Sequence, residues 1–405
     1  MKWDSIQLGE AMDVKHGYAF KSQHFADSGD LVLLSPGNCQ GSGGLKLKGD
    51  KEKYYVGEFP PEFLLSEGDM LVVMTDLINT APILGGSFLI PENNRFLHNQ
   101  RLGLVQLTDE TRLDKTFLYY LLNTYDYRAQ VRGSASGATV RHTSPGRIRG
   151  CSVRVPREVD YQRQIGATLS AYDDLIEDNR RRMALLEDGA RQLYREWFVR
   201  LRFPGYEHTR ITNGVPEGWE AKTLGDLCKD IRETVMPDAL EPDTPYIGLE
   251  HMPRRSISLG NWGTAEQVTS SKHRFREGDI LFGKIRPYFH KVGIAFVDGV
   301  ASSDAIVIRP LERRFLGFVL MTVSSDPFIA VTAQTMKEGS KMPRADWKQM
   351  QAYQAPLPPA GLLGTFEGAL RPMVEQLRTL TFANQKLRAA RDLLLPRVMS
   401  GEIAI

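Results

Sequence analysis

The chain has 405 residues, of which 42% are hydrophobic and 9% aromatic, and its formal net charge is +2. This length predicts two or three domains, and this composition excludes wholesale disorder. The small net charge neither requires nor excludes a nucleic acid as partner, because acidic residues elsewhere can balance a basic face. No segment approaches about 18 uninterrupted apolar residues, and the first residues lack the apolar run of a signal peptide. We therefore expect a cytoplasmic protein with no membrane contact.

Sequence motifs for catalysis are missing. The three cysteines, Cys39, Cys151 and Cys228, form no CxxC pair, so neither a disulfide framework nor a zinc site is expected. The sequence has no GxxxxGK[ST] phosphate loop, no HExxH pair, no GxSxG turn and no Asn-Pro-Pro-aromatic tetrapeptide. Scattered acidic residues such as Asp76 and Asp304 are expected to cap helices or pair with lysines. We expect no metal or cofactor on this chain, and an enzyme is the weaker class of function.

Three short patterns occur twice in the same order. The distance between the two copies is 216, then 210, then 202 residues, a smooth decrease that loops of different length would produce. We therefore predict two similar halves. The matching pairs are Trp3–Glu10 with Trp219–Asp226, Glu67–Leu71 with Glu277–Leu281, and Gly137 with Gly339.

The globular part of each half mixes short apolar runs typical of strands with helical stretches such as Lys115–Arg128. This mixture predicts an α+β fold, and the pattern does not give the strand order. The expected strands include Asp69–Met74, Leu102–Leu107, Ile280–Phe282 and Ala305–Ile308.

A long helical stretch follows each half, with apolar residues recurring in steps of four and three. The two stripes share one register at an offset of 201 residues, which predicts a coiled coil between them. The alternative is two independent amphipathic helices, each packed on its own domain. The predicted seam contains Ile165, Leu169, Ile176, Asn179, Leu186 and Leu193, and Phe366, Leu370, Leu377, Asn384, Leu387 and Leu394.

Polar residues and a proline interrupt the two seams. Asn179 and Asn384 occupy seam positions, where a polar residue sets the register at some cost in stability. Arg391 also lies on the seam and needs a partner or a route to water. Pro372 predicts a kink or a later start of the second helix.

These elements divide the chain into four parts: residues 1–157, a first globular domain; 158–203, a helix; 204–358, a linker with a second globular domain; and 359–405, a second helix. The 33 residues of the first seam span about 50 Å as a helix. Two unlike domains held by such a spacer would suit a ligand with two unlike halves. If that ligand is DNA, its half-sites would lie somewhat more than one helical turn apart.

Basic and hydroxyl residues gather at corresponding places in both halves, in Gly133–Ser144 and around Lys284 and Arg344. Such residues suit contacts to phosphates and base edges, although each loop could also be an ordinary solvated surface. The predicted DNA-binding residues are Lys21, Thr139, Arg141, His142, Thr143, Ser144, Lys284, Arg286, Tyr288, Lys291, Lys341 and Arg344.

The helical motifs are similar to those of the specificity subunits of type I restriction-modification systems. The resemblance extends into both globular domains and covers essentially the whole chain. It is carried by Tyr172–Arg182, Leu193–Phe198, Arg202–Gly205, Pro216–Trp219 and Arg391–Gly401, and by Gly17–Ser22, Thr139–Ser144 and Gly278–Arg286.

This resemblance implies a non-catalytic, DNA-binding subunit with two target recognition domains, each for one half of a split, asymmetric target on double-stranded DNA. It implies that the two helices pack antiparallel and dock two methyltransferase subunits, and that two restriction subunits complete the assembly in a bacterial or archaeal cytoplasm. S-adenosylmethionine, ATP and Mg²⁺ would belong to those partners. A related type II-like or anti-phage methylation system and a coiled-coil protein scaffold stay as alternatives.

A crowded aromatic run, Leu193–Phe198, lies near the end of the first helix. Tyr194, Trp197 and Phe198 are predicted to dock a methyltransferase subunit, because exposed aromatic residues carry much of the binding energy of interfaces. The alternative is that they belong to a core where helix meets domain.

Overall fold

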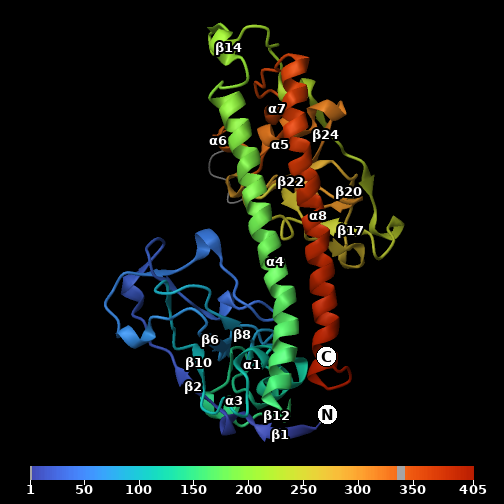
Figure 1. The fold of residues 1–405 in the computed structure, drawn as a ribbon. Helices are drawn as coiled ribbons and strands as arrows, with labels where there is room; N and C mark the ends of the chain where they lie inside the picture. The colour runs from blue at the N-terminus through green and yellow to red at the C-terminus, as the bar shows by residue number, and fades with distance from the viewer. Residues whose placement is uncertain (1, 335–342) are drawn as a thin grey trace. The chain divides into compact units, whose positions relative to one another are not determined.

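The computed structural model describes residues 2–334 and 343–405 (Figure 1). The chain forms two compact units: unit 1 is Met1–Leu175 with Leu387–Ile405, and unit 2 is Ile176–Lys386. Two long helices, α4 (Val159–Tyr194) and α8 (Ala360–Met399), each contribute one part to each unit. Helix α4 ends in a single π turn, Arg195–Val199. Each unit therefore combines one globular domain with a segment of both helices.

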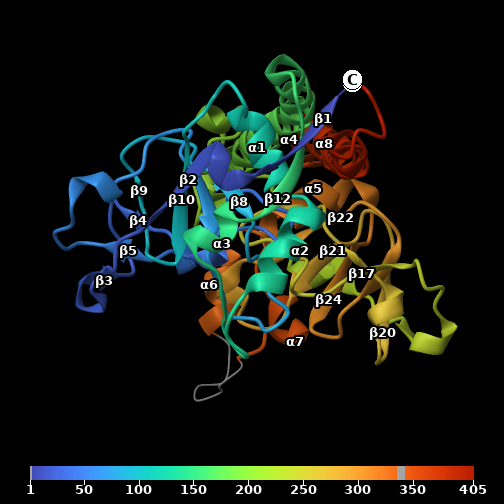
Figure 2. The same ribbon diagram turned by 90° about the horizontal axis from the view of Figure 1, so that it is seen from below.

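The described part of unit 1 contains two four-stranded sheets. The central sheet is antiparallel, and the smaller sheet includes one parallel pair, β4 with β9. Figure 2 shows the smaller sheet beside the central one. The central order is β2 (Met12–His16), β10 (Leu102–Leu107), β6 (Met70–Val73), β8 (Ser87–Leu89); the smaller order is β3 (Phe25–Ala26), β5 (Tyr54–Tyr55), β4 (Val32–Leu33), β9 (Phe96–Leu97); and β1 (Trp3–Gln7) pairs with β12 (Ser152–Pro156).

Three helices and the long helices complete the core of unit 1. Side chains from the central sheet and from α1 (Lys115–Leu121), α2 (Tyr125–Ser134) and α3 (Pro145–Arg149) pack with Ile165 and Leu169 of α4. Val398 and Met399 of α8 belong to the same cluster. Gln162 of α4 is buried, and its amide donates to the carbonyls of Arg112 and Pro156. Both long helices are thus part of this domain's core.

The domain of unit 2 repeats this plan with a five-stranded central sheet, antiparallel except for the parallel pair β18 with β22, and a second sheet that also has one parallel pair, β17 with β23. A short hairpin in the linker, β13 (Ile211–Thr212) with β14 (Val215–Pro216), precedes it. The central order is β15 (Cys228–Asp230), β24 (Ala305–Pro310), β21 (Ile280–Gly283), β22 (Val292–Ala295), β18 (Ser258–Leu259); the second order is β16 (Thr234–Val235), β20 (Lys272–Phe275), β23 (Gly299–Ala301), β17 (Pro245–Ile247), β19 (Gly263–Thr264).

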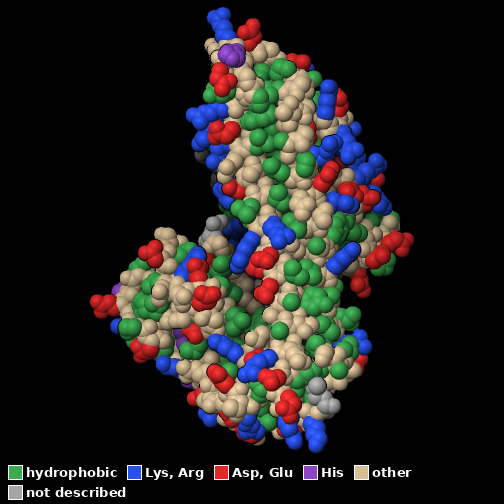
Figure 3. All heavy atoms as spheres, viewed as in Figure 1, with side chains coloured by type: hydrophobic (Ala, Val, Ile, Leu, Met, Phe, Trp, Pro, Cys, Tyr) green, Lys and Arg blue, Asp and Glu red, His purple; other side chains and the backbone are tan. Residues whose placement is uncertain are grey.

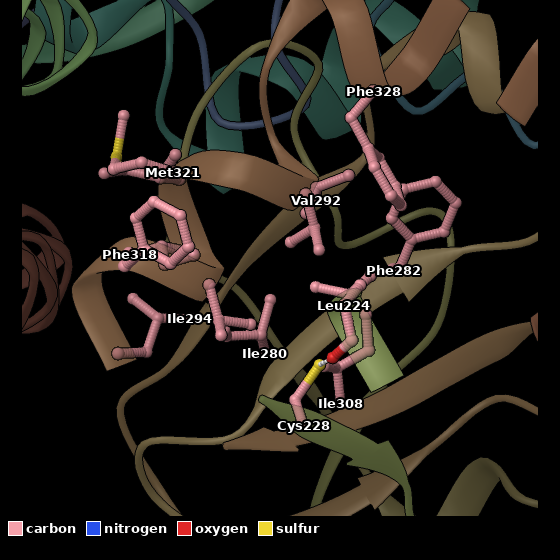
Figure 4. Close-up of a cluster of buried hydrophobic side chains, with 14 of the residues drawn as sticks. Leu224, Cys228, Ile280, Phe282, Val292, Ile294, Ile308, Phe318, Met321 and Phe328 are labelled. Carbon is pink, nitrogen blue, oxygen red and sulfur yellow. Dashed lines mark hydrogen bonds between the residues drawn. The ribbon is translucent and has the colours of Figure 1, made fainter. Parts of the chain in front are cut away.

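Helices α5 (Leu316–Val323), α6 (Asp326–Gln334) and α7 (Trp347–Met350) cover this central sheet. Figure 4 shows Phe318 and Met321 of α5 and Phe328 of α6 with side chains of the sheet, including Ile280 and Phe282. Within the described residues, no single helix has the length and apolarity to cross a membrane; the bent pair 313–323 and 326–334 meets the criterion by length and composition only.

The predicted repeat is confirmed by the strand order, because β2-β10-β6-β8 corresponds to β15-β24-β21-β22. The turn before the third strand is the same in both copies. Asp69 Oδ2 accepts from the Ser66 N–H at 2.8 Å, and Asp279 Oδ2 accepts from the Arg276 N–H at 2.8 Å. Gly68 and Gly278 have φ of 80° and 88° in these turns, a region that favours glycine.

The predicted pairing of the long helices is confirmed, and within each unit it is antiparallel. In unit 1 the start of α4 packs with the end of α8, and in unit 2 the end of α4 packs with the start of α8. Most seam residues are buried; Leu186, Leu193, Leu387 and Leu394 are half-buried. The two seam asparagines meet in unit 2, where Asn179 Nδ2 donates to Asn384 Oδ1 at 2.9 Å.

The other two interruptions have different outcomes. Arg391 finds its partner in unit 1, where its guanidinium pairs with Asp173 of α4 and with Asp392. The hydroxyl of Tyr120 in α1 donates to the second oxygen of Asp173 at 2.7 Å, so the pair also ties α4 to the globular domain. A start of the second helix after Pro372 is wrong, because α8 begins at Ala360.

A half-buried carboxylate joins α8 to the second domain. Glu367 Oε1 accepts from the Phe318 N–H at 2.9 Å, at the start of α5. A Cβ on Gly317 would lie 2.8 Å from the same oxygen and 2.5 Å from Leu370 Cδ2, so any larger residue there would displace both side chains. Burial raises the pKa of Glu367 to about 7, while the backbone N–H groups and Arg371 act in the opposite direction.

The asparagine pair predicts a specific pattern of stabilities. Asn179→Ala should lower the free energy of unfolding by about 1–3 kcal/mol, because it leaves the buried Asn384 amide without its partner. The double variant Asn179→Leu/Asn384→Leu should lie within about 1 kcal/mol of the wild type, since both polar groups are removed together. Urea unfolding of the full chain measures this, with exposed Leu185→Ala as control on the same helix. An equal loss in the single and double variants would contradict the pairing.

Glu367 predicts a pH dependence with a definite sign. Because its pKa is raised above the ordinary 4.5, the folded state binds this proton more tightly than the unfolded state does. The resulting stabilisation is fully present below pH 4.5 and is lost as the pH rises towards about 7. Relative to the wild type, Glu367→Gln should therefore become progressively more stable over this interval, as measured by urea unfolding at several pH values. A difference that stays constant with pH would refute the assignment.

Candidate nucleic-acid interface

A two-stranded ribbon follows the third strand of the central sheet in the first domain. It pairs β7 (Thr75–Asp76) with β11 (Arg141–His142), and the Thr143 N–H donates to the Met74 carbonyl at 2.9 Å. The second domain has the same arrangement, since Ile285 bridges to Arg344 and the Ala345 N–H donates to the Lys284 carbonyl at 2.9 Å. These pairs correspond at the offsets of 210 and 202 residues found in the sequence. The two predicted basic loops therefore occupy equivalent places.

The ribbon of the first domain presents polar side chains to solvent. Thr139 and His142 are exposed, and the His142 ring nitrogen Nδ1 lies 3.1 Å from the Thr75 hydroxyl. Ser144 caps α3 by accepting from the Arg147 N–H. Arg141 is half-buried, and its guanidinium donates to the Arg132 carbonyl at 2.9 Å. Arg141 and Ser144 therefore stabilise the loop, whereas the exposed Thr139 and His142 can contact a ligand.

In the second domain, Arg286, Tyr288 and Arg344 are exposed. Arg344 forms an ion pair with Asp304 at 3.2 Å that leaves its guanidinium largely accessible. Lys284 is half-buried, and its amine donates to the Ser303 carbonyl at 2.9 Å; burial lowers the pKa of this amine. Lys284 therefore stabilises the base of the ribbon.

Four predicted DNA-binding residues differ from expectation or lie elsewhere. Thr143 is buried, so its prediction as a contact is corrected. Lys291 is corrected as well, because its amine turns inward to the Leu249 carbonyl. Lys21 is exposed at the N-cap of a 3-10 turn that leads into the smaller sheet, outside the ribbon. Lys341 lies outside the described residues.

Sequence reasoning missed the loop that follows β7. Leu77 and Ile78 are exposed there, directly after Asp76, whose carboxylate is buried. Asp76 Oδ1 accepts from the Ile78 N–H at 3.0 Å, and Oδ2 accepts from the Ile83 N–H at 2.8 Å. The sequence repeat does indicate this loop, because the 210-residue offset aligns Ile78 with Tyr288, a predicted DNA-binding residue.

Comparison with known proteins explains this two-fold plan. The family model for the type I restriction modification DNA specificity domain matches residues 1–188 and 216–361. The chain belongs to this family. Its globular domains are therefore recognition domains, and its function is DNA sequence specificity.

Relatives and a solved structure agree with this assignment. The MjaIX specificity subunit of Methanocaldococcus jannaschii is 22% identical over 81% of this chain and 77% of its own length. The EcoDI specificity subunit of Escherichia coli is 24% identical over 82% of this chain and 76% of its own. The crystal structure of an S subunit from M. genitalium has a TM-score of 0.59 at 14% identity, covering 98% of this chain and 95% of that one, and it shares the fold.

The aromatic residues predicted to dock a partner belong to a core cluster of unit 2. Tyr194 is corrected, because it is only 8% exposed and its hydroxyl lies 3.1 Å from the Thr322 hydroxyl. Trp197 and Phe198 are half-buried, with rings 5.8 and 4.8 Å from that of Phe366. The alternative prediction, that these residues belong to a core, therefore holds fully for Tyr194 and in part for Trp197 and Phe198.

Other apolar side chains of the long helices are more exposed. Leu175, Leu185 and Leu393 are 52%, 73% and 67% exposed, respectively. The space-filling view shows apolar and charged side chains mixed along the visible face of α4 and α8 (Figure 3). These leucines are better candidates for partner contacts than Tyr194, because they are accessible without unfolding the domain.

Among residues 2–334 and 343–405, no group of three or more His, Cys, Asp or Glu side chains could hold a metal ion. The three cysteines are buried thiols, and burial raises the pKa of each. The described side chains of the ribbons offer hydrogen bonds and positive charge to a ligand. This chemistry suits recognition.

A substitution at Arg344 tests whether the ribbon of the second recognition domain binds DNA. Arg344→Ala should weaken DNA binding about tenfold while changing the free energy of unfolding by less than about 1 kcal/mol, because the exposed ion pair with Asp304 contributes little. The matched control is Arg314→Ala, which breaks an exposed ion pair with Glu312 beyond the opposite end of β24. Titration of labelled duplex DNA and urea unfolding measure the two effects. Equal affinity losses in both variants would exclude a specific role of the ribbon.

Proposed function

We propose that this chain selects the DNA target for a type I restriction-modification complex and performs no catalysis itself. Each recognition domain reads one half of a split, asymmetric sequence through its ribbon and the adjoining loops. The observation that carries the proposal is the pair of equivalent ribbons with different side chains. Identical backbone bonds place His142 in one domain and Arg344 in the other, so the same surface offers different donors to each half-site.

The paired helices serve as the spacer and as the dock for two methyltransferase subunits, and two restriction subunits complete the complex. The names of the relatives, each a specificity subunit of a type I restriction enzyme, support this assembly. The exposed leucines of α4 and α8 offer apolar contacts for such partners. S-adenosylmethionine, ATP and Mg²⁺ act on the partner subunits, and the complex works in the cytoplasm, where its DNA substrates are.

An exchange of one recognition domain tests the proposal. Replacing residues 2–157 by the first recognition domain of a relative, with α4 and α8 retained, should change one half of the methylated motif and leave the other half and the gap unchanged. The helices are retained because Ile165, Leu169, Val398 and Met399 belong to the core of the first unit. Single-molecule sequencing of methylated genomic DNA measures the motif. A continuous palindrome, or a change in both halves, would refute the proposal.

A further inference from the structure

Large apolar or aromatic side chains are exposed at the same end of the central sheet in both recognition domains. Leu77 and Ile78 are 62% and 55% exposed in the first domain, and Tyr288 is 48% exposed in the second. Ile78 and Tyr288 each lie eight residues after the first residue of the equivalent strands β6 and β21. We name 77–80 the first tip and 286–290 the second tip.

The backbone of the first tip is held in place by a buried carboxylate. The carboxylate of Asp76 accepts the N–H groups of Ile78 and Ile83, and this side chain is only 1% exposed. Both bonds are local, so they set the path of the backbone whatever side chains the tip carries. Leu77 and Ile78 are thereby held towards solvent instead of folding back onto the sheet.

The second tip contains two residues with a left-handed backbone conformation, and two guanidinium groups lie near an aromatic ring within it. Arg286 and His290 have φ of 51° and 50°, and they flank a 3-10 turn closed by bonds to the carbonyls of Arg286 and Pro287. The Arg254 guanidinium lies 3.9 Å from the centre of the Phe289 ring, and Arg286 lies 5.8 Å from it. Non-glycine residues keep this left-handed conformation only where surrounding contacts hold them in it. Such residues concentrate at functional sites.

The side chains at the two tips differ in kind. The residue aligned with Arg286 is the buried Asp76, so the first tip places apolar side chains in solvent beside the exposed His142 ribbon. The second tip carries an exposed guanidinium beside Tyr288 and the Arg344 ribbon. In the major groove, the C5-methyl of thymine is the apolar group of a base edge, and the O6 and N7 atoms of guanine match the two donors of arginine.

We propose that the two tips are base-reading elements with different preferences: Leu77 and Ile78 contact a thymine methyl in one half-site, and Arg286 with Tyr288 reads a guanine in the other. This inference rests on the proposed function and deepens it. It predicts an A·T pair and a G·C pair at equivalent positions of the two half-sites, which makes the target asymmetric. The neighbouring ribbons supply base-edge contacts of their own and phosphate contacts that hold the tips in register.

The test selects preferred duplexes from a randomised DNA library with the full chain bound to its modification subunits. The variants are Leu77→Ala/Ile78→Ala and Arg286→Lys with Tyr288→Ala. The first should lose about fourfold in preference for A·T at one position, the value of one buried methyl group. The second should lose about tenfold or more in preference for G·C at one position of the other half-site.

Matched controls lie at the opposite end of each sheet. Leu89→Ala is such a control in the first domain, because Leu89 pairs with Met70 at the far end of β6; Leu311→Ala, beyond the end of β24, serves the second. Thermal unfolding and the milder Ile78→Val identify any loss caused by misfolding. An unchanged motif in folded tip variants, or changes in both half-sites from one variant, would overturn the inference. A wild-type complex that enriches no split sequence would instead refute the proposed function.

Discussion

The apolar stripes of α4 and α8 are buried against each other and against the recognition domains at the same time. In unit 1, Ile165 and Leu169 share one core with the central sheet, and in unit 2, Phe366 and Leu370 do the same. Each domain therefore needs both helices to complete its core. Each recognition domain and its own segments of the two helices form one structure, so the direction in which that domain presents its ribbon relative to those segments depends on how the segments pair.

Polar groups give this pairing its register. An apolar stripe alone tolerates sliding by one turn, because leucine contacts are similar at every step. The buried Asn179–Asn384 bond and the half-buried Asp173–Arg391 pair each satisfy polar atoms in one alignment only. Tyr120, bonded to the same Asp173, extends this constraint to the first recognition domain.

The sequence predicted features that repeat over long distances and missed those that depend on a few residues. The heptad pattern located the seam, and the interruption at Arg391 predicted a need for a partner that Asp173 meets. Strands of two residues, such as β7 and β11, leave no periodic pattern in the sequence. Only the basic residues therefore indicate where the ribbons lie. Burial of Thr143 and the inward turn of Lys291 follow from tertiary packing, which residue type does not encode.

Unit 1 draws its core from both ends of the chain, and this affects the order in which the protein folds during synthesis. The ribosome releases the first segment of unit 1 early, but Val398 and Met399, which are buried in its core, emerge more than 220 residues after Leu175, the end of that segment. All of unit 2 is contained in Ile176–Lys386, so it can close before that point. The domain made first is thus finished last, and until then it exposes an apolar surface that the end of α8 will cover.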